Sequence, residues 1–352
     1  MFESLIESWD GEEVAIRYDH ELSTWMFIAV HSTRLGPAAG GTRMKVYPTP
    51  GDALRDALRL SSAMTRKLAV PCAPYGGGKA VLAVPRVPEG EERVRLMERY
   101  GDFVDSLGGT YQTAPDVNTG SEDMDIVGTR TKHVFGGSPE RGGSGNTAPA
   151  TAQGVYYGIR AAVEHALGSD SLAGRTIVVQ GVGDVGGRLA KLLAADGAKV
   201  LVSDIDERLA GTVAAEIGGA VVPVTDALVT ECDLLAPCAL GGVLNPESIP
   251  RLKCHVVAGA ANNQLLQDSD AQLLKERGIL YAPDYVVNAG GVLHGVGLEQ
   301  LGWSEAELEK QLKGITETLR EIFHAAETED ITTELAAQRI ALRNIETAGK
   351  LR

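Results

Sequence analysis

The sequence predicts an α/β protein of two domains, the second of them built on a doubly wound parallel sheet. Three observations lead to this fold class. The chain has 352 residues, enough for two domains that each bury a core. In its second half, short runs that are apolar throughout alternate with helix-length segments, as in a parallel sheet covered on both faces. One such run, TIVVQ at 176–180, leads directly into a glycine-rich turn and a helix.

Composition and charge exclude several classes of protein. The chain is 44% hydrophobic and 23% charged, which is typical of a globular protein, and its net charge of −14 disfavours nucleic acid and anionic membranes as partners. The acidic N-terminal segment lacks the features of a secretory leader, and no run of about 18 apolar residues occurs, so we expect a cytoplasmic protein. The four cysteines form no CxxC pair, so neither a metal site nor a disulfide framework is expected.

The first half mixes strands and helices. Two β-type runs, 12–18 and 25–31, flank a polar stretch and predict an antiparallel pair. Apolar residues at helical spacing from Asp52 predict a helix that stops just before Lys67. A glycine cluster at 76–78 then precedes a buried strand, KAVLAV, and an amphipathic helix is expected at 90–107. The first domain is therefore expected to be α/β or α+β.

A polar, glycine-rich stretch at 136–147 indicates a crossing between domains. We place a first domain at 1–145, a Rossmann domain at 146–290, and C-terminal helices at 291–352 that return toward the first domain. Thr147 and Pro149 suit a helix start. Ser304 and Glu307 form a capping-box pattern before a long amphipathic helix, and a second helix follows it. The strands expected in the parallel sheet are 176–180, 199–204, 220–224, 232–237, 255–260 and 279–284.

The glycine-rich turn has the pattern of a dinucleotide-binding loop. Gly181 would permit the tight turn, Gly183 would let the backbone approach a pyrophosphate, and Gly186 would let the helix pack closely on the strand. Asp204 ends the next strand, where its carboxylate would bind an unphosphorylated ribose and repel a 2′-phosphate. NAD is therefore expected in preference to NADP, although Arg208 nearby weakens that preference.

Two lysines lie among small and apolar residues. GGGKA is not a phosphate-binding loop, because Ala73 and Ala80 occupy positions where the pattern needs Gly and Ser or Thr. A partly desolvated Lys79 beside a second cation, with Lys67 twelve residues before it, would have a lowered pKa and could act as a general base. The alternative is two ordinary solvated lysines.

Two further segments carry candidate polar groups. In TAPDVNTGSEDMD, Asp116 lies closest to the apolar side and could exchange protons with a buried lysine, although an acidic loop is often merely solvated. Asn262 and Asn263 follow a buried strand, and Asn288 precedes a helix start. Amides at the carboxyl edge of a parallel sheet would face the cofactor crevice.

Taken together, these segments resemble the glutamate, leucine, valine and phenylalanine dehydrogenase superfamily, over essentially the whole chain. The resemblance rests on nine ordered motifs: LGPAAGGTRM, AMTRK, GGGKA, PDVNT, ERGGSG, QGVGDVGG, APCALGG, AGAANNQ and APDYVVNAGG. It implies an N-terminal substrate-binding and oligomerisation domain, a Rossmann domain that binds NAD, and a homo-oligomer. The implied reaction is the reversible oxidative deamination of an L-amino acid to its 2-oxo acid, ammonia and NADH.

The resemblance also implies roles for individual residues. Lys67 would hold the substrate carboxylate, Lys79 would be the catalytic base, and Asp116 would relay protons. Either Asn262 or Asn263 would help to hold substrate or nicotinamide. The side-chain pocket would be lined by Ala39, Gly40, Met64, Ala114, Val292 and Gly295. The cofactor would be held by Gly181, Val182, Gly183, Asp184, Val185, Gly186, Asp204, Ala239, Asn262 and Asn288.

The small pocket residues Ala39 and Gly295 would make room for a ring, so an aromatic amino acid, phenylalanine first, is the expected substrate. Tyrosine and tryptophan are further aromatic possibilities. A leucine or valine dehydrogenase is the alternative within this enzyme class. A non-catalytic NAD-binding sensor is also compatible with the glycine loop, but it would not need Lys67, Lys79 and Asp116. An engineered amine dehydrogenase should lack Lys67, which this chain retains.

Overall fold

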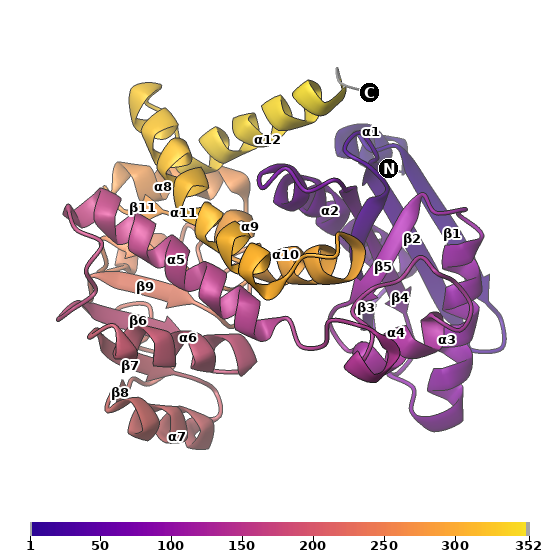
Figure 1. The fold of residues 1–352 in the computed structure, drawn as a ribbon, viewed down its shortest axis with the longest axis horizontal. Helices are drawn as coiled ribbons and strands as arrows, with labels where there is room; N and C mark the ends of the chain where they lie inside the picture. Colours follow the sequence, from indigo (N-terminus) through magenta and orange to yellow (C-terminus); the bar gives the residue numbers. More distant parts are fainter. Residues whose placement is uncertain (1, 350–352) are drawn as a thin grey trace. The chain divides into compact units, whose positions relative to one another are not determined.

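The computed structural model describes residues 2–349, which form two compact units (Figure 1). Unit 1 runs to Asn146 and also contains Gly295–Trp303 and the chain from Ala341. Unit 2 comprises Thr147–His294 and Ser304–Ile340. The C-terminal segment therefore differs from the expected 291–352 block, because most of it belongs to unit 2.

The helix α11, Glu305–Thr328, belongs to unit 2 because it packs along α5, Ala148–Leu167. Two glycines of α5 permit the close approach. A Cβ on Gly154 would lie 2.9 Å from the Ile315 side chain, and one on Gly158 would lie 3.2 Å from that of Leu319. Ile315 and Leu319 both belong to the apolar face that the periodicity of α11 predicts, and both are buried.

Unit 1 is built on a five-stranded mixed sheet in the order β1-β2-β4-β3-β5. The pairs β1–β2 and β2–β4 are antiparallel, and β3 is parallel to both β4 and β5. The expected antiparallel pair at the start of the chain is therefore confirmed. The strands are β1 Glu13–Asp19, β2 Thr24–Ser32, β3 Ala38–Lys45, β4 Gly76–Ala83 and β5 Tyr111–Pro115.

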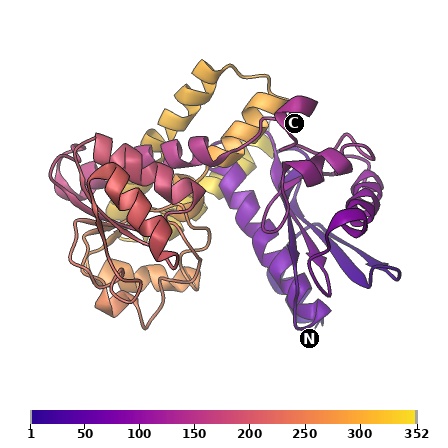
Figure 2. The ribbon, with the colours of Figure 1, turned by 90° about the horizontal axis from the view of Figure 1, so that it is seen from below.

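Helices cover both faces of this sheet, and Figure 2 shows α2 and α3 on opposite sides of it. The helix α2 begins at a Thr49 cap with Pro50 in its first turn. Its apolar face packs on Phe27, Ala29 and Val81. The helices of unit 1 are α1 Phe2–Trp9, α2 Pro50–Ala69, α3 Gly90–Asp105, α4 Ser121–Val127, the 3₁₀ turn η1 Pro139–Arg141 and the π-helical η4 Val296–Gln300.

Two expectations about local structure in unit 1 are wrong. The helix α2 does not stop before Lys67 but continues to Ala69, because Leu68 and Ala69 still point into the core and only Pro71 prevents its extension. The glycines at 76–78 are not a loop before the strand but its first residues. A Cβ on Gly76 would lie 1.8 Å from the Ser32 carbonyl oxygen, so only glycine permits this pairing.

Unit 2 is the expected doubly wound domain, a six-stranded parallel sheet in the order β11-β10-β9-β6-β7-β8. On one face α5 and α6 pack on the strands, and α8 covers the other face through the Leu235 and Val257 layer. The strands are β6 Thr176–Gln180, β7 Lys199–Ser203, β8 Ala220–Val221, β9 Leu234–Pro237, β10 Val256–Val257 and β11 Leu280–Tyr281.

The remaining helices complete unit 2 or lead out of it. The expected starts are confirmed in position: Thr147 precedes α5, and the Ser304 hydroxyl accepts a hydrogen bond from the Glu307 N–H at the start of α11. These elements are α6 Asp184–Ala195, α7 Glu207–Ile217, η2 Ile249–Arg251, η3 Asp268–Asp270, α8 Ala271–Glu276, α9 Asp284–Val287, α10 Gly290–Gly295 and α12 Thr333–Gly349. Within residues 2–349 no helix is both long enough and apolar enough to span a membrane.

Candidate active site

The register of unit 1 brings three of the predicted site residues onto one face of the sheet. The strand β3 lies between β4 and β5, and Gly41 stands in the row between Lys79 of β4 and Ala114 of β5. Ala39, two residues earlier on β3, shares this face because side chains alternate along a strand. We call this the Lys79 face.

Lys79 forms a buried ion pair with Asp116. The Lys79 Nζ lies 2.9 Å from the Asp116 Oδ2, and the side chains are 6% and 20% exposed. Gly41 makes room for the pair, because a Cβ at that position would approach the Asp116 Cβ to 2.8 Å and the Lys79 Nζ to 3.3 Å. The two residues that the sequence singled out as base and proton relay are thus in direct contact.

The surroundings change the pKa values of both groups. Burial lowers the pKa of Lys79 most strongly, and the nearby Arg43 charge lowers it further, while Asp116 acts in the opposite direction. For Asp116, burial alone would raise the pKa, but the charges of Lys79 and Arg43 outweigh burial and hold it well below its usual range. Asp116 is therefore an anion, and Lys79 loses its proton more readily than a solvated lysine does.

Arg43 is a member of this site that the sequence patterns did not single out. Its Nε donates to Asp116 Oδ2 at 3.0 Å and its Nη1 donates to Asp56 Oδ2 at 3.0 Å. Tyr47 donates its hydroxyl hydrogen to the same Asp56 oxygen at 2.7 Å. A signal was available, because Arg43 is two residues from Gly41 on a strand and must lie on the same face. The second cation beside Asp116 is this arginine.

The loop that carries Asp116 is held at several points. Thr119 accepts a hydrogen bond from the Asp116 N–H and donates to the Thr42 carbonyl. Asp123, which belongs to the acidic part of this segment, is 3% exposed and forms a bidentate ion pair with Arg93 of α3. Arg93 also donates to the Asn118 carbonyl at 2.8 Å. These contacts restrict the position of the Asp116 carboxylate.

The other predicted residues of unit 1 lie in different settings. Lys67 and Met64 are on the last turns of α2, partly buried. Gly40 is out of step with Ala39 and Gly41, so its Cα hydrogens lie toward the opposite face of the sheet, and its place in the pocket stays a prediction. A Cβ on Gly40 would lie 1.8 Å from the Gly78 carbonyl oxygen, and its own carbonyl accepts the Tyr111 hydroxyl. Only glycine therefore permits this packing of β3 on β4.

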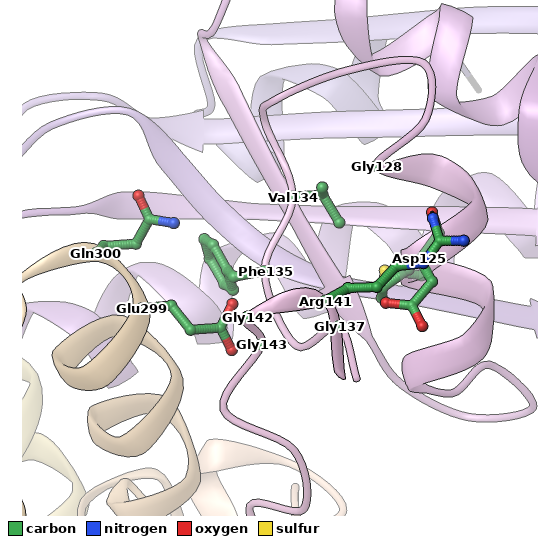
Figure 3. A pocket seen from close by; sticks show the side chains of 11 residues that line it. Asp125, Gly128, Val134, Phe135, Gly137, Arg141, Gly142, Gly143, Glu299 and Gln300 are labelled. Atoms are coloured by element: carbon green, nitrogen blue, oxygen red, sulfur yellow. The ribbon is translucent and has the colours of Figure 1, made fainter. Parts of the chain in front are cut away.

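A separate cavity of about 310 Å³ lies in unit 1 beside the ERGGSG motif (Figure 3). It is formed where the loop from Phe135 to Gly143 meets η4, and Glu299 binds the two segments together. The Glu299 carboxylate accepts hydrogen bonds from the Gly136 and Ser144 N–H groups and from the Ser144 hydroxyl. The Glu299 carboxylate is thus engaged by the chain itself, so we interpret this cavity as a structural feature of the crossing segments.

The glycine loop of unit 2 has the geometry that the sequence predicts. Gly181 has a φ of +92°, which L side chains rarely adopt. A Cβ on Gly183 would meet nothing within 4 Å, whereas one on Gly186 would lie 1.9 Å from the Gly181 carbonyl oxygen. Gly183 is thus open to an approaching ligand, and Gly186 is required by packing of α6 on the strand. Val182, Asp184 and Val185 complete this loop and the start of α6.

Asp204 and Ala239 flank this loop. Asp204 follows β7, and its carboxylate accepts hydrogen bonds from the N–H groups of Val182 and Asp206. Ala239 follows β9 and lies against Gly181, since a Cβ on that glycine would approach its backbone N to 2.8 Å. Both residues therefore lie at the carboxyl edge of the parallel sheet, where dinucleotides bind.

The amides of this edge differ from one another. Asn288 is buried and donates to the Asn262 Oδ1 at 2.9 Å and to the Ala260 carbonyl at 3.1 Å, whereas its own Oδ1 has no partner in the described chain. Asn263 has a φ of +52°, and its carbonyl accepts the Gly242 N–H. Asn263 is therefore a turn residue, a common use of asparagine. A buried acceptor without a partner in the described chain, at the same edge of the sheet as the open glycine loop, fits a dinucleotide with an amide group.

The sequence patterns also did not reveal the residues that hold this edge in place. Gln264 is fully buried, and its Nε2 donates to the carbonyls of Gly259 and Ala261. Its backbone N–H donates to the Asp284 carboxylate. Asp284, at the end of an apolar run, was the available signal, whereas Gln264 follows two asparagines and does not stand out.

The last two pocket residues predicted from the sequence, Val292 and Gly295, are both on α10. Val292 belongs to unit 2 and Gly295 to unit 1, so the boundary between the units falls within this helix. A Cβ on Gly295 would meet no atom within 4 Å. A larger side chain therefore has room there.

Comparison with known proteins defines the class of this fold and site. Residues 15–133 match the family model "Glu/Leu/Phe/Val dehydrogenase, dimerisation domain", and residues 142–218 and 206–352 match "Glutamate/Leucine/Phenylalanine/Valine dehydrogenase". The chain belongs to this family of amino-acid dehydrogenases, whose cofactor is NAD, and the resemblance carried by the nine motifs is confirmed.

Individual relatives cover nearly the whole chain. It is 43% identical to a leucine dehydrogenase of Geobacillus stearothermophilus over 99% of this chain and 94% of that protein. It is 40% identical to a phenylalanine dehydrogenase of Lysinibacillus sphaericus, over 95% and 88% of the two chains. The crystal structure of L-tryptophan dehydrogenase from Nostoc punctiforme superposes with a TM-score of 0.84 at 39% identity, covering 99% and 100% of the chains.

Proposed function

We propose that this protein catalyses the reversible, NAD-dependent oxidative deamination of an apolar L-amino acid to its 2-oxo acid and ammonia, with Lys79 as the catalytic base. The buried contact between Lys79 and Asp116 carries the proposal. It supplies an amine that is partly desolvated beside a carboxylate that remains ionised. A non-catalytic NAD-binding protein would have no use for such a pair.

Each residue then has a separate task. Lys67, as a cation, holds the substrate carboxylate. When bound, NAD⁺ would accept the hydride from the substrate α-carbon. The residues of the protein would transfer only protons.

Neutral Lys79 takes a proton from the substrate ammonium group and releases it to solvent. Neutral again, it takes a proton from the water that adds to the iminium carbon. Asp116 accepts and returns protons as the carbinolamine loses ammonia. Lys79 returns the water proton to the carbinolamine nitrogen, and Asp116 passes the hydroxyl proton to the departing ammonia. The products are therefore the 2-oxo acid, ammonium and the one proton released to solvent.

Residues of the glycine loop are proposed to hold the cofactor. Gly181 to Gly186 would surround the pyrophosphate, with Asp204 at the adenosine ribose and Ala239 beside the loop. Asn288 and Asn262 would bind the nicotinamide end, because Asn288 offers an unpartnered acceptor. Asn262 is the better candidate of the two neighbouring asparagines, since its side chain contacts that of Asn288, whereas the turn at Asn263 involves its backbone.

For the substrate, we propose a branched-chain aliphatic amino acid, leucine first. This reverses the order expected from the sequence, which put phenylalanine before leucine and valine. The support is the similarity over 99% of the chain to the leucine dehydrogenase. The second candidate is an aromatic amino acid. It is favoured by the small Ala39 on the Lys79 face and by the open space at Gly295.

A substrate panel tests both parts of the proposal. The purified protein is incubated with NAD and each of the common L-amino acids, and NADH is followed by its absorbance. We expect the highest kcat/KM with leucine or valine. Faster turnover of phenylalanine or tryptophan would favour the second candidate. If no amino acid yields NADH while NADH itself binds, the protein is a sensor rather than an enzyme.

We also propose that the chain is a homo-oligomer that assembles through unit 1. The support is the match of residues 15–133 to a model described as a dimerisation domain. Light scattering coupled to size-exclusion chromatography measures the mass directly. A particle with the mass of one 37.1 kDa chain at micromolar concentration would contradict the proposal.

A further inference from the structure

Arg43 connects the Lys79–Asp116 pair to a carboxylate outside it. Its Nε lies 3.0 Å from Asp116 Oδ2, the same oxygen that Lys79 Nζ approaches to 2.9 Å. Its Nη1 lies 3.0 Å from Asp56 Oδ2 on α2. Arg43 and Lys79 thus contact the same oxygen of Asp116, and the charge of Arg43 is in turn balanced by Asp56. The side chains of Arg43 and Asp56 are 18% and 16% exposed, so solvent screens these charges only weakly.

We propose that Arg43 is a positioning residue that holds the Asp116 carboxylate and that its charge, balanced against Asp56, keeps Lys79 available as a neutral base. This inference rests on the proposed function, because it assigns a task to Arg43 in the reaction of Lys79. It goes beyond that function because it assigns the control of the protonation state of Lys79 to Arg43 of β3 and Asp56 of α2.

The charged and titratable groups around Lys79 that form this cluster come from two elements, β3 and α2, and from two loops. Arg43 extends from β3, Asp116 follows β5, and Asp56 and Arg59 belong to α2, where Arg59 binds the other Asp56 oxygen at 3.0 Å. Tyr47, from the loop after β3, donates to Asp56. Arg59 is 55% exposed, so its influence is the weakest.

These neighbours act on Lys79 in opposite directions. After burial, which lowers its pKa most, Asp116 raises the pKa of Lys79, Arg43 lowers it and Asp56 raises it. Removing the Arg43 charge should therefore favour protonated Lys79, and removing the Asp56 charge should favour the neutral amine. A role confined to holding the fold together would not produce opposite signs.

The test is the pH dependence of kcat/KM for amino-acid oxidation in three variants. Activity rises with pH as Lys79 loses its proton, so this acidic limb reports the base. Arg43→Gln, which keeps a hydrogen-bond donor but no charge, should move the limb to higher pH by about one unit or more. Asp56→Asn should move it to lower pH by a smaller amount. Arg43→Lys should leave it near the wild-type position.

Arg99→Gln is the matched control. Arg99 also binds two carboxylates, Asp19 and Glu21, but none of these groups contacts Lys79 or Asp116. The acidic limb of kcat/KM for Arg99→Gln should stay at its wild-type pH. Limbs that stay in place in both Arg43→Gln and Asp56→Asn, or that move in the same direction, would overturn the inference. If Arg43→Gln does not fold, Asp56→Asn alone decides by the sign of its shift.

A second measurement does not depend on turnover. Trace acetylation of the native protein at several pH values, read by peptide mass spectrometry, gives the titration of the Lys79 amine in each variant. The same opposite shifts are expected, and unchanged titration would overturn the inference. An inactive wild-type protein whose Lys79 still shows these shifts would contradict the proposed function while leaving the electrostatic role of Arg43 supported.

Discussion

Lys79 and Lys45 lie on neighbouring strands, yet one is buried and the other exposed. We expect Lys79→Ala to reduce kcat by about 10²–10⁴-fold, the range for loss of a general base, while NADH still binds.

Lys67→Ala should mainly raise KM, because it removes a contact to the substrate carboxylate. Steady-state kinetics and NADH fluorescence titration measure both effects.

Lys45→Ala is the control for Lys79→Ala and should keep the wild-type kcat and KM. A Lys79→Ala variant that retains near-normal kcat would show that the base has been assigned to the wrong residue.

Asp204 is expected to determine coenzyme choice. Its carboxylate is held by two backbone N–H groups at the end of β7, so a 2′-phosphate would meet a fixed negative charge. Asp204→Ala should narrow the ratio of kcat/KM for NAD over NADP. Asp206→Ser is the control, because serine can still cap α7 while the neighbouring charge is removed. Wild-type kcat/KM that is equal for the two coenzymes would argue against this role.

Ala39 and Gly295 provide the test of side-chain specificity. Ala39→Leu or Gly295→Val should penalise a ring and improve contact with a smaller aliphatic substrate. At about 0.8 kcal/mol for each buried methylene, the ratio of kcat/KM for phenylalanine over leucine should fall by about ten- to a hundredfold. A Cβ on Gly295 meets no atom within 4 Å apart from its chain neighbours and the backbone of its own helix, so valine introduces no clash at Cβ with another element. A ratio that neither substitution changes would show that these positions do not line the pocket.

Among the secondary-structure elements, η4 is joined to the loop from Phe135 to Gly143 by the side chain of Glu299. Glu299 accepts three hydrogen bonds from the segment that contains this loop and Ser144, and a hydrogen bond to a charged group contributes about 1.5–3 kcal/mol. Glu299→Ala should therefore release the loop and let trypsin bind the chain around Arg141, increasing the initial cleavage rate by about tenfold or more. Mass spectrometry of the fragments identifies the cleavage site.

Glu305→Ala, on the exposed first turn of α11, removes a glutamate without touching this loop and serves as the control. Equal cleavage after Arg141 in both variants and the wild type would mean that Glu299 does not hold the loop.

The molecule as a whole should lose stability in acid through its paired aspartates. Burial alone would raise the pKa of Asp56, but its hydrogen bond from Tyr47 and the Arg43 charge hold it below the usual value of 3.8, and that of Asp116 is also lowered. A folded-state pKa below the unfolded one stabilises the fold above pH 3.8, and this contribution is lost as the pH falls toward the folded value.

Guanidinium unfolding at several pH values measures this effect. The midpoint for the wild type should fall steeply below pH 3.8, whereas the Asp56→Asn midpoint should be lower at neutral pH and fall less. Parallel pH dependence of the two proteins would show that Asp56 does not contribute.

The local pattern of residues was sufficient for much of this fold and site. Gly181, Gly183 and Gly186 have separate tasks that can be predicted because a strand, a tight turn and a helix follow one another within a few residues, and local geometry leaves few alternatives. The apolar face of α11 and the hairpin of β1 and β2 are likewise predicted by periodicity, which depends only on neighbouring positions. Lys79 and Asp116 are recognised from their motifs.

Other features depend on contacts between residues far apart in the chain. The order of the strands places β3 between β4 and β5, and only this arrangement puts Arg43 against Asp116 and reveals Gly41, rather than Gly40, as the glycine on the Lys79 face. The assignment of α11 to unit 2 depends in the same way on its packing against α5. Periodicity assigns a residue to a face of its own element, but it contains no information about which element will cover that face.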